Sequence, residues 1–324
     1  MRPRWIAEGH RARPRASYLV RGLCSLALLG LLFYLIPIDQ VVSTLANLSW
    51  PIFLFAILSQ FLARAAGALK VKLIAADQGF ELSCAAALRI MLTAHYYSLM
   101  LPGPVAGGAV TWLRLLGQGA SRGAAAATIV VNRGIGIAVM LALGSGAWLL
   151  DAGYLDSVEL GLALILLGST LVWALQNRTT PAAVGSEASG RLSRFFDRLM
   201  VFRRMAPASK LIVIVSSVAQ EAIAAVVIWL FGLAVGLELE LLAIFWIRAL
   251  LQLVLLLPIA IAGLGLREAS LIGLGALIGV DPANALTWSL AIFAGTVVVG
   301  AVGGLLEAGV IARMLGLDVR QRPR

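Results

Sequence analysis

Long apolar runs dominate the chain, and short polar turns separate them. Six of these runs are roughly as long as the ~20 residues that a helix needs to cross a bilayer. They lie at about 20–37, 49–69, 123–150, 157–176, 210–235 and 284–312. The pattern therefore predicts an all-α polytopic membrane protein with about six full transmembrane helices, forming a single membrane domain over residues 1–324, with a short turn around Asp39 joining the first two.

Two further apolar runs, 84–118 and 241–279, are each interrupted at their centre by proline and glycine. The first break includes Gly107 and Gly108, and the second includes Gly263 and Gly265. Unwound backbone at membrane depth is tolerated only inside protein or beside a wet cavity. Each run is therefore predicted to form a re-entrant hairpin of two half-helices, whose glycines allow turns and close helix approach and leave amides facing a substrate.

Composition agrees with a membrane protein, because 60% of residues are hydrophobic and only 13% are charged. The mean hydropathy is +0.94. Membrane topology accounts for the formal charge of +10, because 23 of the 26 Lys and Arg residues fall in segments predicted to lie on one side of the membrane. These segments are 1–21, 64–89, 114–122, 178–210 and 313–324. By the positive-inside rule both termini are expected in the cytoplasm, at the inner membrane. No nucleic-acid-binding module is visible.

The two breaks resemble each other, which suggests an internal repeat. Leu101-Pro102 and Ala106-Gly107 recur as Leu257-Pro258 and Ala262-Gly263, each 156 residues later. We predict repeat one over about 49–150 and repeat two over about 210–312, inverted relative to each other. The basic loop 178–209 between them is either a solvated linker or, over Arg191–Met205, an amphipathic helix lying on anionic lipid.

Charged residues inside apolar runs are candidates for a binding site, because burying a charge in the membrane is costly. Arg267 and Glu268 follow the second break directly. Arg267 is predicted to donate two hydrogen bonds to a phosphate, with Glu268 orienting it or taking part in proton coupling. The alternative is an ion pair that only holds the hairpin together.

Arg133, Glu221 and Arg248 are the other candidates for substrate binding. Arg133 and Glu221 both lie near the middle of a span and are predicted either to pair or to form a site. Arg248 is interpreted as a second phosphate contact or as the counter-charge of Glu221 or Glu268. His95 is a weak candidate, and mutual neutralisation of Arg133, Arg248 and Arg267 by Glu221, Glu268 and Glu307 is a further hypothesis.

The same residues carry a family resemblance. Leu101-Pro102-Gly103 with Gly107-Gly108, the pair Asn132-Arg133, and the run from Ala262 to Glu268 followed by Gly279-Val280 resemble the flippase-like family that includes the membrane domain of lysylphosphatidylglycerol synthase. Ala109 and Gly134–Gly136 stand where family members often carry acids, so no role is transferred to those positions. The resemblance implies an all-helical domain that moves lipids or lipid-linked intermediates between leaflets.

The leading functional hypothesis is therefore a lipid transporter whose partner is an anionic or lipid-linked membrane lipid. No nucleophile elbow, P-loop or metal-ligand cluster is visible, so no catalytic residue, metal or cofactor is predicted. The alternatives are an enzyme that modifies lipid headgroups, with Glu268 or Glu221 as general base, and a scaffold that recruits a lipid-modifying enzyme through 178–209.

Overall fold

The computed structural model describes residues 38–100, 106–151, 198–199, 201–256 and 264–314, and all regular structure in these residues is α-helical. Four helices are long and apolar enough to cross a membrane, which confirms the predicted all-helical, multi-pass class. They are α3 (Trp50–Asp77), α6 (Arg122–Leu150), α10 (Pro207–Ala234) and α13 (Pro282–Met314). The spans predicted at 20–37 and 157–176 lie outside the described residues.

Shorter helices connect and flank the long ones. They are α2 (Ile38–Ala46), α4 (Cys84–Met100), α5 (Ala106–Leu116), α9 (Val201–Arg204), α11 (Leu241–Leu255) and α12 (Leu266–Ala276). The short turn predicted around Asp39 is wrong, because this segment is helix α2. Asp39 lies in its first turn, where a carboxylate complements the helix dipole. Val41 of α2 packs with Ala283 and Leu286 of α13.

The helices fall into two runs with the same order, long, short, short and long. α10 begins 157 residues after α3 (207 against 50), and α11 follows α4 by the same interval (241 against 84). α12 follows α5 by 160 residues, and α13 follows α6 by 160. The offset of 156 was predicted from the two breaks, and most residues of those breaks lie outside the described part. In the chain, each break lies between the second and third helices of its run.

The turns of the two runs also correspond. Gly79 and Gly236 have φ of 86°, and each sits just after a long helix. Beyond each glycine a backbone amide returns to the helix, from Phe80 N to the Ala75 carbonyl at 3.2 Å and from Leu237 N to the Gly232 carbonyl at 2.9 Å. Glycine takes this left-handed conformation without steric cost, so both helices end on the same kind of cap.

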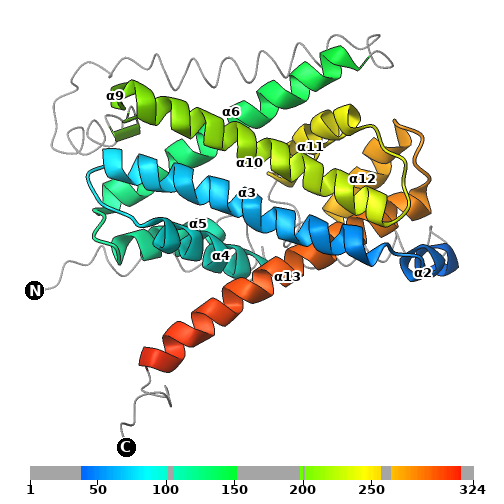
Figure 1. Ribbon diagram of the computed structural model, residues 1–324, viewed down its shortest axis with the longest axis horizontal. Helices are drawn as coiled ribbons and strands as arrows, with labels where there is room; N and C mark the ends of the chain where they lie inside the picture. The colour runs from blue at the N-terminus through cyan, green and yellow to red at the C-terminus, as the bar shows by residue number, and fades with distance from the viewer. Residues whose placement is uncertain (1–37, 101–105, 152–197, 200, 257–263, 315–324) are drawn as a thin grey trace, which may run out of the picture.

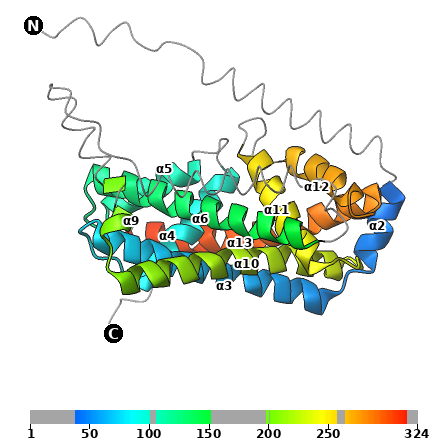
Figure 2. The same ribbon diagram turned by 90° about the horizontal axis from the view of Figure 1, so that it is seen from above.

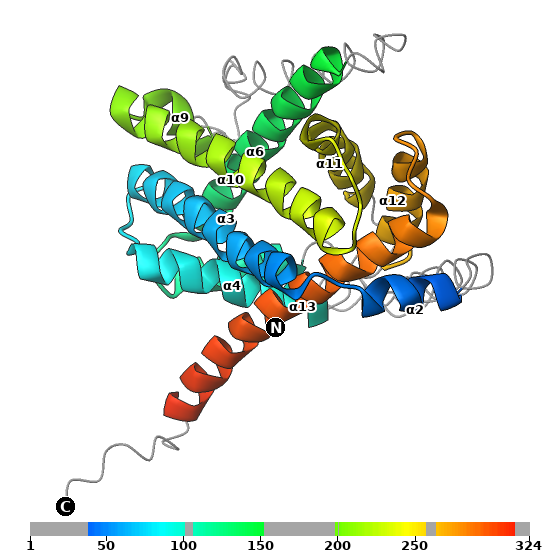
Figure 3. The same ribbon diagram turned by 45° about the vertical axis from the view of Figure 1, so that its right-hand side comes forward.

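Helices α3 and α10 lie side by side and run in opposite directions through the centre of the molecule (Figure 1). The short helices α5 and α12 lie on the same side of this pair (Figure 2). The fourth helix of each run contacts the second helix of the other run, so α6 packs on α11 and α13 packs on α4. Figure 3 shows α13 crossing the molecule from α2 and α12 to beyond α4.

Glycines on α13, among them Gly303 and Gly304, let this helix approach α4 closely. A Cβ at Gly303 would lie only 2.2 Å from the Leu92 carbonyl oxygen. A Cβ at Gly304 would touch the ring of Tyr96 at 2.9 Å. Small residues of this kind are how membrane helices gain van der Waals contact.

The two ends of the α4–α5 segment meet at one end of the molecule, which we call the basic end. Phe80 and Leu82, before α4, share a buried cluster with Leu115, in the last turn of α5, and with Ala120, after α5. Lys72, Arg89, Arg114, Arg122, Arg198, Arg204 and Lys210 lie near the helix termini at this end. The α4–α5 segment therefore enters and leaves the helix bundle at the same end.

Part of the predicted basic loop contacts this end. Arg198 Nη1 donates to Ser121 Oγ at 2.8 Å, and Gln78 Nε2 donates to the Arg198 carbonyl at 2.8 Å. Ser121 caps α6, since its side chain accepts a hydrogen bond from the Ala124 amide. Most of the amphipathic helix predicted over Arg191–Met205 lies outside the described residues, which include α9.

Candidate functional site

Four charged side chains meet where α3 packs against α10, and we call them the central cluster. Arg64 and Lys70 come from α3, Glu221 from α10 and Arg248 from α11. Glu221 pairs with Arg248 through its Oε2 atom. This pair confirms one alternative predicted for Arg248 and excludes, in this structure, the predicted pairing of Glu221 with Arg133.

Lys70 lies near the same carboxylate and interacts with its charge. The lysine is only 1% exposed, and Glu221 is 7% exposed. A Cβ at Gly136 of α6 would lie 3.6 Å from Lys70 Nζ and 3.7 Å from Glu221 Oε1. Both charges therefore face the same small residue, and a larger side chain at Gly136 would push between them.

Arg64 completes the cluster through His95 of α4. Arg64 Nη2 lies 3.1 Å from His95 Nδ1, and His95 Nε2 lies 3.3 Å from the Thr296 carbonyl oxygen of α13. An arginine can only donate and a carbonyl can only accept, so His95 is a neutral imidazole with its proton on Nε2. His95 thus fixes Arg64 to α13.

The central cluster holds three cations and one carboxylate. The charges of Arg248 and Glu221 both reach Arg64, so repulsion and attraction act on it together. Arg248 Nε is buried and has no hydrogen-bond partner among the described residues. A surplus of positive charge with an unused donor, held among membrane-spanning helices, is a physical reason to bind an anion.

Arg64 and Lys70 are the residues that the sequence analysis missed. They were counted with the basic segment 64–89, which overlaps the end of the span predicted over 49–69. In the structure α3 continues to Asp77 and keeps both side chains within the helix bundle. The apolar residues Val71, Leu73 and Ile74 continue the helix and were the available signal.

Arg133 of α6 lies apart from this cluster. It is exposed, and its Nη2 would be 3.3 Å from a Cβ placed on Gly108, in the first turn of α5. Gly107 lies in the same turn and packs closely on α4, since its Cβ would be 3.1 Å from the Ala94 carbonyl oxygen. The predicted three-against-three neutralisation is wrong, because Glu307 pairs with Arg114 and Arg133 has no ion-pair partner among the described residues.

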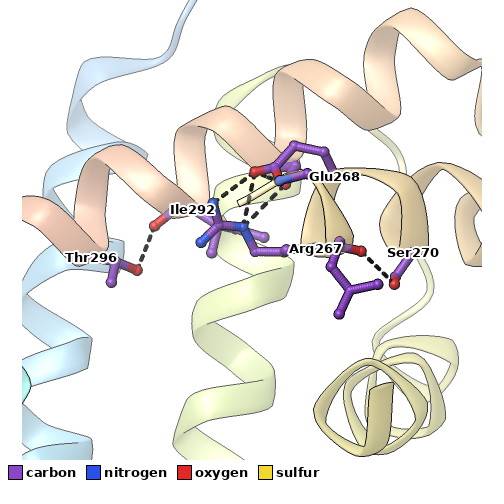
Figure 4. Close-up of polar contacts among 8 residues, drawn as sticks. Arg267, Glu268, Ser270, Ile292 and Thr296 are labelled. Carbon is purple, nitrogen blue, oxygen red and sulfur yellow. Dashed lines mark hydrogen bonds and ion pairs between the residues drawn. The ribbon is translucent and has the colours of Figure 1, made fainter. Parts of the chain in front are cut away.

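The Arg267–Glu268 pair is held entirely by protein groups (Figure 4). Arg267 Nη2 donates to Glu268 Oε1 at 2.7 Å, and Arg267 Nε lies 3.3 Å from Ser289 Oγ. The guanidinium also stacks over the Phe293 ring, 4.8 Å from its centroid. Arg267 is 7% exposed and Glu268 is 1% exposed, so neither group is open to a ligand in this conformation.

Glu268 also closes the first turn of its own helix. Its Oε2 accepts a hydrogen bond from the Gly265 amide at 2.6 Å, which satisfies a donor that the helix start would otherwise leave free. Gly265 has φ of 80°, as expected of a glycine at a turn. The geometry therefore favours the structural interpretation of Arg267 and Glu268, and Gly263 lies outside the described residues.

The described residues contain no group of three or more His, Cys, Asp or Glu side chains arranged to hold a metal ion. What the central cluster offers instead is arginine and lysine donors, which suit phosphate and carboxylate groups. Comparison with known proteins gives one family. The family model described as the lysylphosphatidylglycerol synthase TM region matches residues 18–304. No curated protein matches the chain.

Proposed function

Because the chain belongs to the lysylphosphatidylglycerol synthase TM region family, we propose that it moves an anionic membrane lipid between leaflets without changing it chemically. Its family places it among membrane proteins related to lipid metabolism. The lipid is a phospholipid or a lipid-linked intermediate whose phosphate binds at the central cluster. The single observation that carries this proposal is the surplus of cations around Glu221, of which Lys70 is buried and Arg64 and Arg248 are half-buried.

The energetic argument starts from the cost of burying charge. Lys70 and Glu221 are almost fully buried, and one carboxylate has to serve Arg64, Lys70 and Arg248. An unpaired charge in the interior costs several kcal/mol. A phosphate brought to the cluster would remove that cost and use the free Nε donor of Arg248, so the site favours an anionic headgroup over a neutral one.

The arrangement of helices supports alternating access around this site. We propose that α3–α6 and α10–α13 are inverted repeats, because their helices recur at offsets of 157 and 160 and α3 runs opposite to α10 (Figure 1). The segments α4–α5 and α11–α12 would then be re-entrant hairpins that enter from opposite faces. Arg64 and Glu221, one from each repeat, lie at the junction between them.

The basic end supports one orientation of the protein in the membrane. We propose that it faces the cytoplasm, at the inner membrane, with both chain termini on the same side, because Lys and Arg are enriched in cytoplasmic segments. The turns at the opposite end carry Glu238, Glu240 and Asp281 and no basic residue. The membrane potential would then act on any anionic headgroup that moves between the two ends.

Reconstitution tests the proposal. Vesicles that contain the full-length protein and a fluorescent phosphatidylglycerol would report movement between leaflets by loss of fluorescence to a membrane-impermeant quencher. We expect the variant Arg64→Gln/Lys70→Gln to slow this movement about ten-fold or more, because each charge-assisted bond to phosphate is lost. Lys72→Gln, two residues beyond Lys70 on the same helix, is the matched control and should leave the rate unchanged.

Two results would contradict the proposal. One is that the wild-type protein moves neither phosphatidylglycerol nor any other anionic lipid tested. The other is that the double variant folds and moves lipid at the wild-type rate. Mass analysis of the vesicle lipids adds a separate readout, since a new lipid species would indicate an enzyme rather than a transporter.

A further inference from the structure

A hollow lined by charged side chains lies at the basic end, between α4, α5 and α13. This cavity has a volume of ≈ 230 Å³. Five polar side chains line it, and we call it the basic-end pocket. They are Arg89 and Thr93 of α4, Arg114 of α5, Gln118 in the following turn and Glu307 of α13.

The charges of the basic-end pocket do not balance. Glu307 pairs with Arg114 and also accepts a hydrogen bond from the Tyr97 hydroxyl at 3.3 Å. The Arg89 side chain is exposed and has no hydrogen-bond or ion-pair partner among the described residues. One guanidinium with all of its donors free therefore lines the pocket and gives it a net positive charge. A guanidinium of this kind can bind a phosphate through two donors.

The equivalent place in the second run of helices is filled with apolar side chains. Corresponding residues of the second helices lie 157 apart in the chain, so Arg89 corresponds to Trp246 and Thr93 to Leu250. In the third and fourth helices the interval is 160, so Arg114 corresponds to Leu274 and Glu307 to Ala147. Trp246 is fully buried and stacks edge-on with Trp148, 4.7 Å between ring centroids. None of these four positions in the helix pair α6–α11 or in α12 carries a charged side chain.

The surroundings of the basic-end pocket suit a lipid better than a free ion. Leu113, next to Arg114, is 60% exposed, and Leu305, two residues before Glu307, is 73% exposed. In a membrane these leucines would contact acyl chains. A phospholipid could therefore place its phosphate on Arg89 while its chains follow α5 and α13.

From this geometry we infer that the basic-end pocket binds the phosphate of an anionic phospholipid taken from the leaflet at the basic end, and that the four corresponding positions of the second run do not bind one. The pocket and the central cluster share helix α4, since Thr93 lines the pocket and His95 holds Arg64. The pocket is thus a loading site from which a headgroup reaches the centre, and this loading role rests on the proposed function.

Photo-crosslinking tests the inference on the full-length protein in phosphatidylcholine nanodiscs. The probe is a short-chain phosphatidylglycerol with a photoreactive group next to the phosphate. We expect labelled peptides around Arg89, Gln118 and Glu307, and none around Trp246. The variant Arg89→Trp/Thr93→Leu copies the residues of the second run and should lower the labelling of these peptides about ten-fold.

Matched variants separate binding from folding. Arg122→Gln removes an exposed arginine at the same end, outside the pocket, and should leave labelling unchanged. Arg89→Lys keeps the charge but not the two-pronged donor, so labelling should fall less than with Arg89→Gln. A thermal unfolding curve for each variant identifies any that fail to fold, and the Arg89→Lys and Arg89→Gln comparison then carries the test.

The outcomes are distinguishable. Equal labelling in Arg89→Gln and wild type, or labelling around Trp246 as strong as around Arg89, would overturn the inference. Competition by millimolar inorganic phosphate as effective as competition by unlabelled phosphatidylglycerol would show a free-anion site instead of a lipid site. If the wild-type protein moves no lipid but the pocket is labelled as expected, the proposed function fails and the lipid site stands without its loading role.

Discussion

Arg64 of α3 and Glu221 of α10 occupy the same position in two corresponding helices, 14 residues after the first residue of each, and their opposite charges interact where the two helices pack together. One run contributes an arginine and the other a glutamate to a single interface. The equivalence of the runs is therefore broken at the place where the charges are buried, and the cluster gains its counter-charge from this asymmetry.

Removing the carboxylate should have a large effect. Glu221→Gln would leave Arg64, Lys70 and Arg248 without their counter-charge, and we expect a loss of about 3–5 kcal/mol of stability. Thermal unfolding in detergent would measure it. Glu240→Gln, at an exposed position, is the control. Added phosphatidylglycerol should restore more stability to Glu221→Gln than to wild type, because an anion replaces the missing charge, and equal restoration would contradict this.

Breaking the Arg267–Glu268 pair should destabilise helix α12 and the turn that precedes it. Glu268→Ala removes both the ion pair and the hydrogen bond to the Gly265 amide, so we expect a loss of about 3–5 kcal/mol. The double variant Arg267→Met/Glu268→Met should recover much of this loss because no buried charge remains. Unfolding midpoints of the single and double variants measure the difference, and a double variant no better than the single one would argue against a structural pair.

His95 is expected to stay neutral with its proton on Nε2. Nitrogen NMR of ¹⁵N-histidine-labelled protein should show an unprotonated Nδ1, as its contact with Arg64 requires. His95→Gln should be tolerated, since Gln252 stands at the corresponding position of α11 and an amide can both accept and donate. His95→Leu should cost about 1–3 kcal/mol. A resonance pattern of the Nδ1–H tautomer would disprove the assignment.

The close contact of α13 with α4 depends on a glycine at position 303. Gly303→Ala would place a methyl group against the Leu92 carbonyl, and forced separation of this kind typically costs about 1–3 kcal/mol. Gly146→Ala on α6 is the matched control, because nothing lies within 4 Å of its added Cβ. The two variants are compared by thermal unfolding, and equal midpoints would contradict the packing argument.

Single-cysteine labelling tests the hairpins. In a protein whose Cys24 is replaced by serine, the native, exposed Cys84 and a cysteine at Gln118 should react with a membrane-impermeant reagent from the same side. Cysteines at Leu241 and Gly279 should both react from the other side. Residues 84 and 118 on different faces would mean that α4–α5 crosses the membrane, and the inverted arrangement would then be abandoned.

The helical class and the four long helices of the described part were predicted from the sequence, because apolar runs of this length have few other solutions in a membrane. For Arg248 and for Arg267 with Glu268, an ion pair was one of two alternatives, and the structure contains both pairs. The partner of each remaining charged residue depends on how the helices pack. Glu307 meets Arg114 only because α13 crosses α5 and α4, which lie nearly 200 residues earlier in the chain.

The role of Arg64 and Lys70 was missed for a physical reason. Counting charges groups every basic residue near the end of a span with the aqueous segment that follows. In the structure both residues lie within the helix bundle, and Glu221 supplies a counter-charge from α10. Helix α2 was missed because it is only nine residues long and packs on α13 through Val41.

The crossing of α6 onto α11 and of α13 onto α4 has a consequence for synthesis. Helix α4 is made well before α13, which covers its His95 and Tyr96 face. Until α13 emerges, His95 lacks the Thr296 carbonyl and Arg114 lacks Glu307, and contacts this distant in the chain form slowly. The newly made first run of helices therefore exposes these polar groups until α13 inserts.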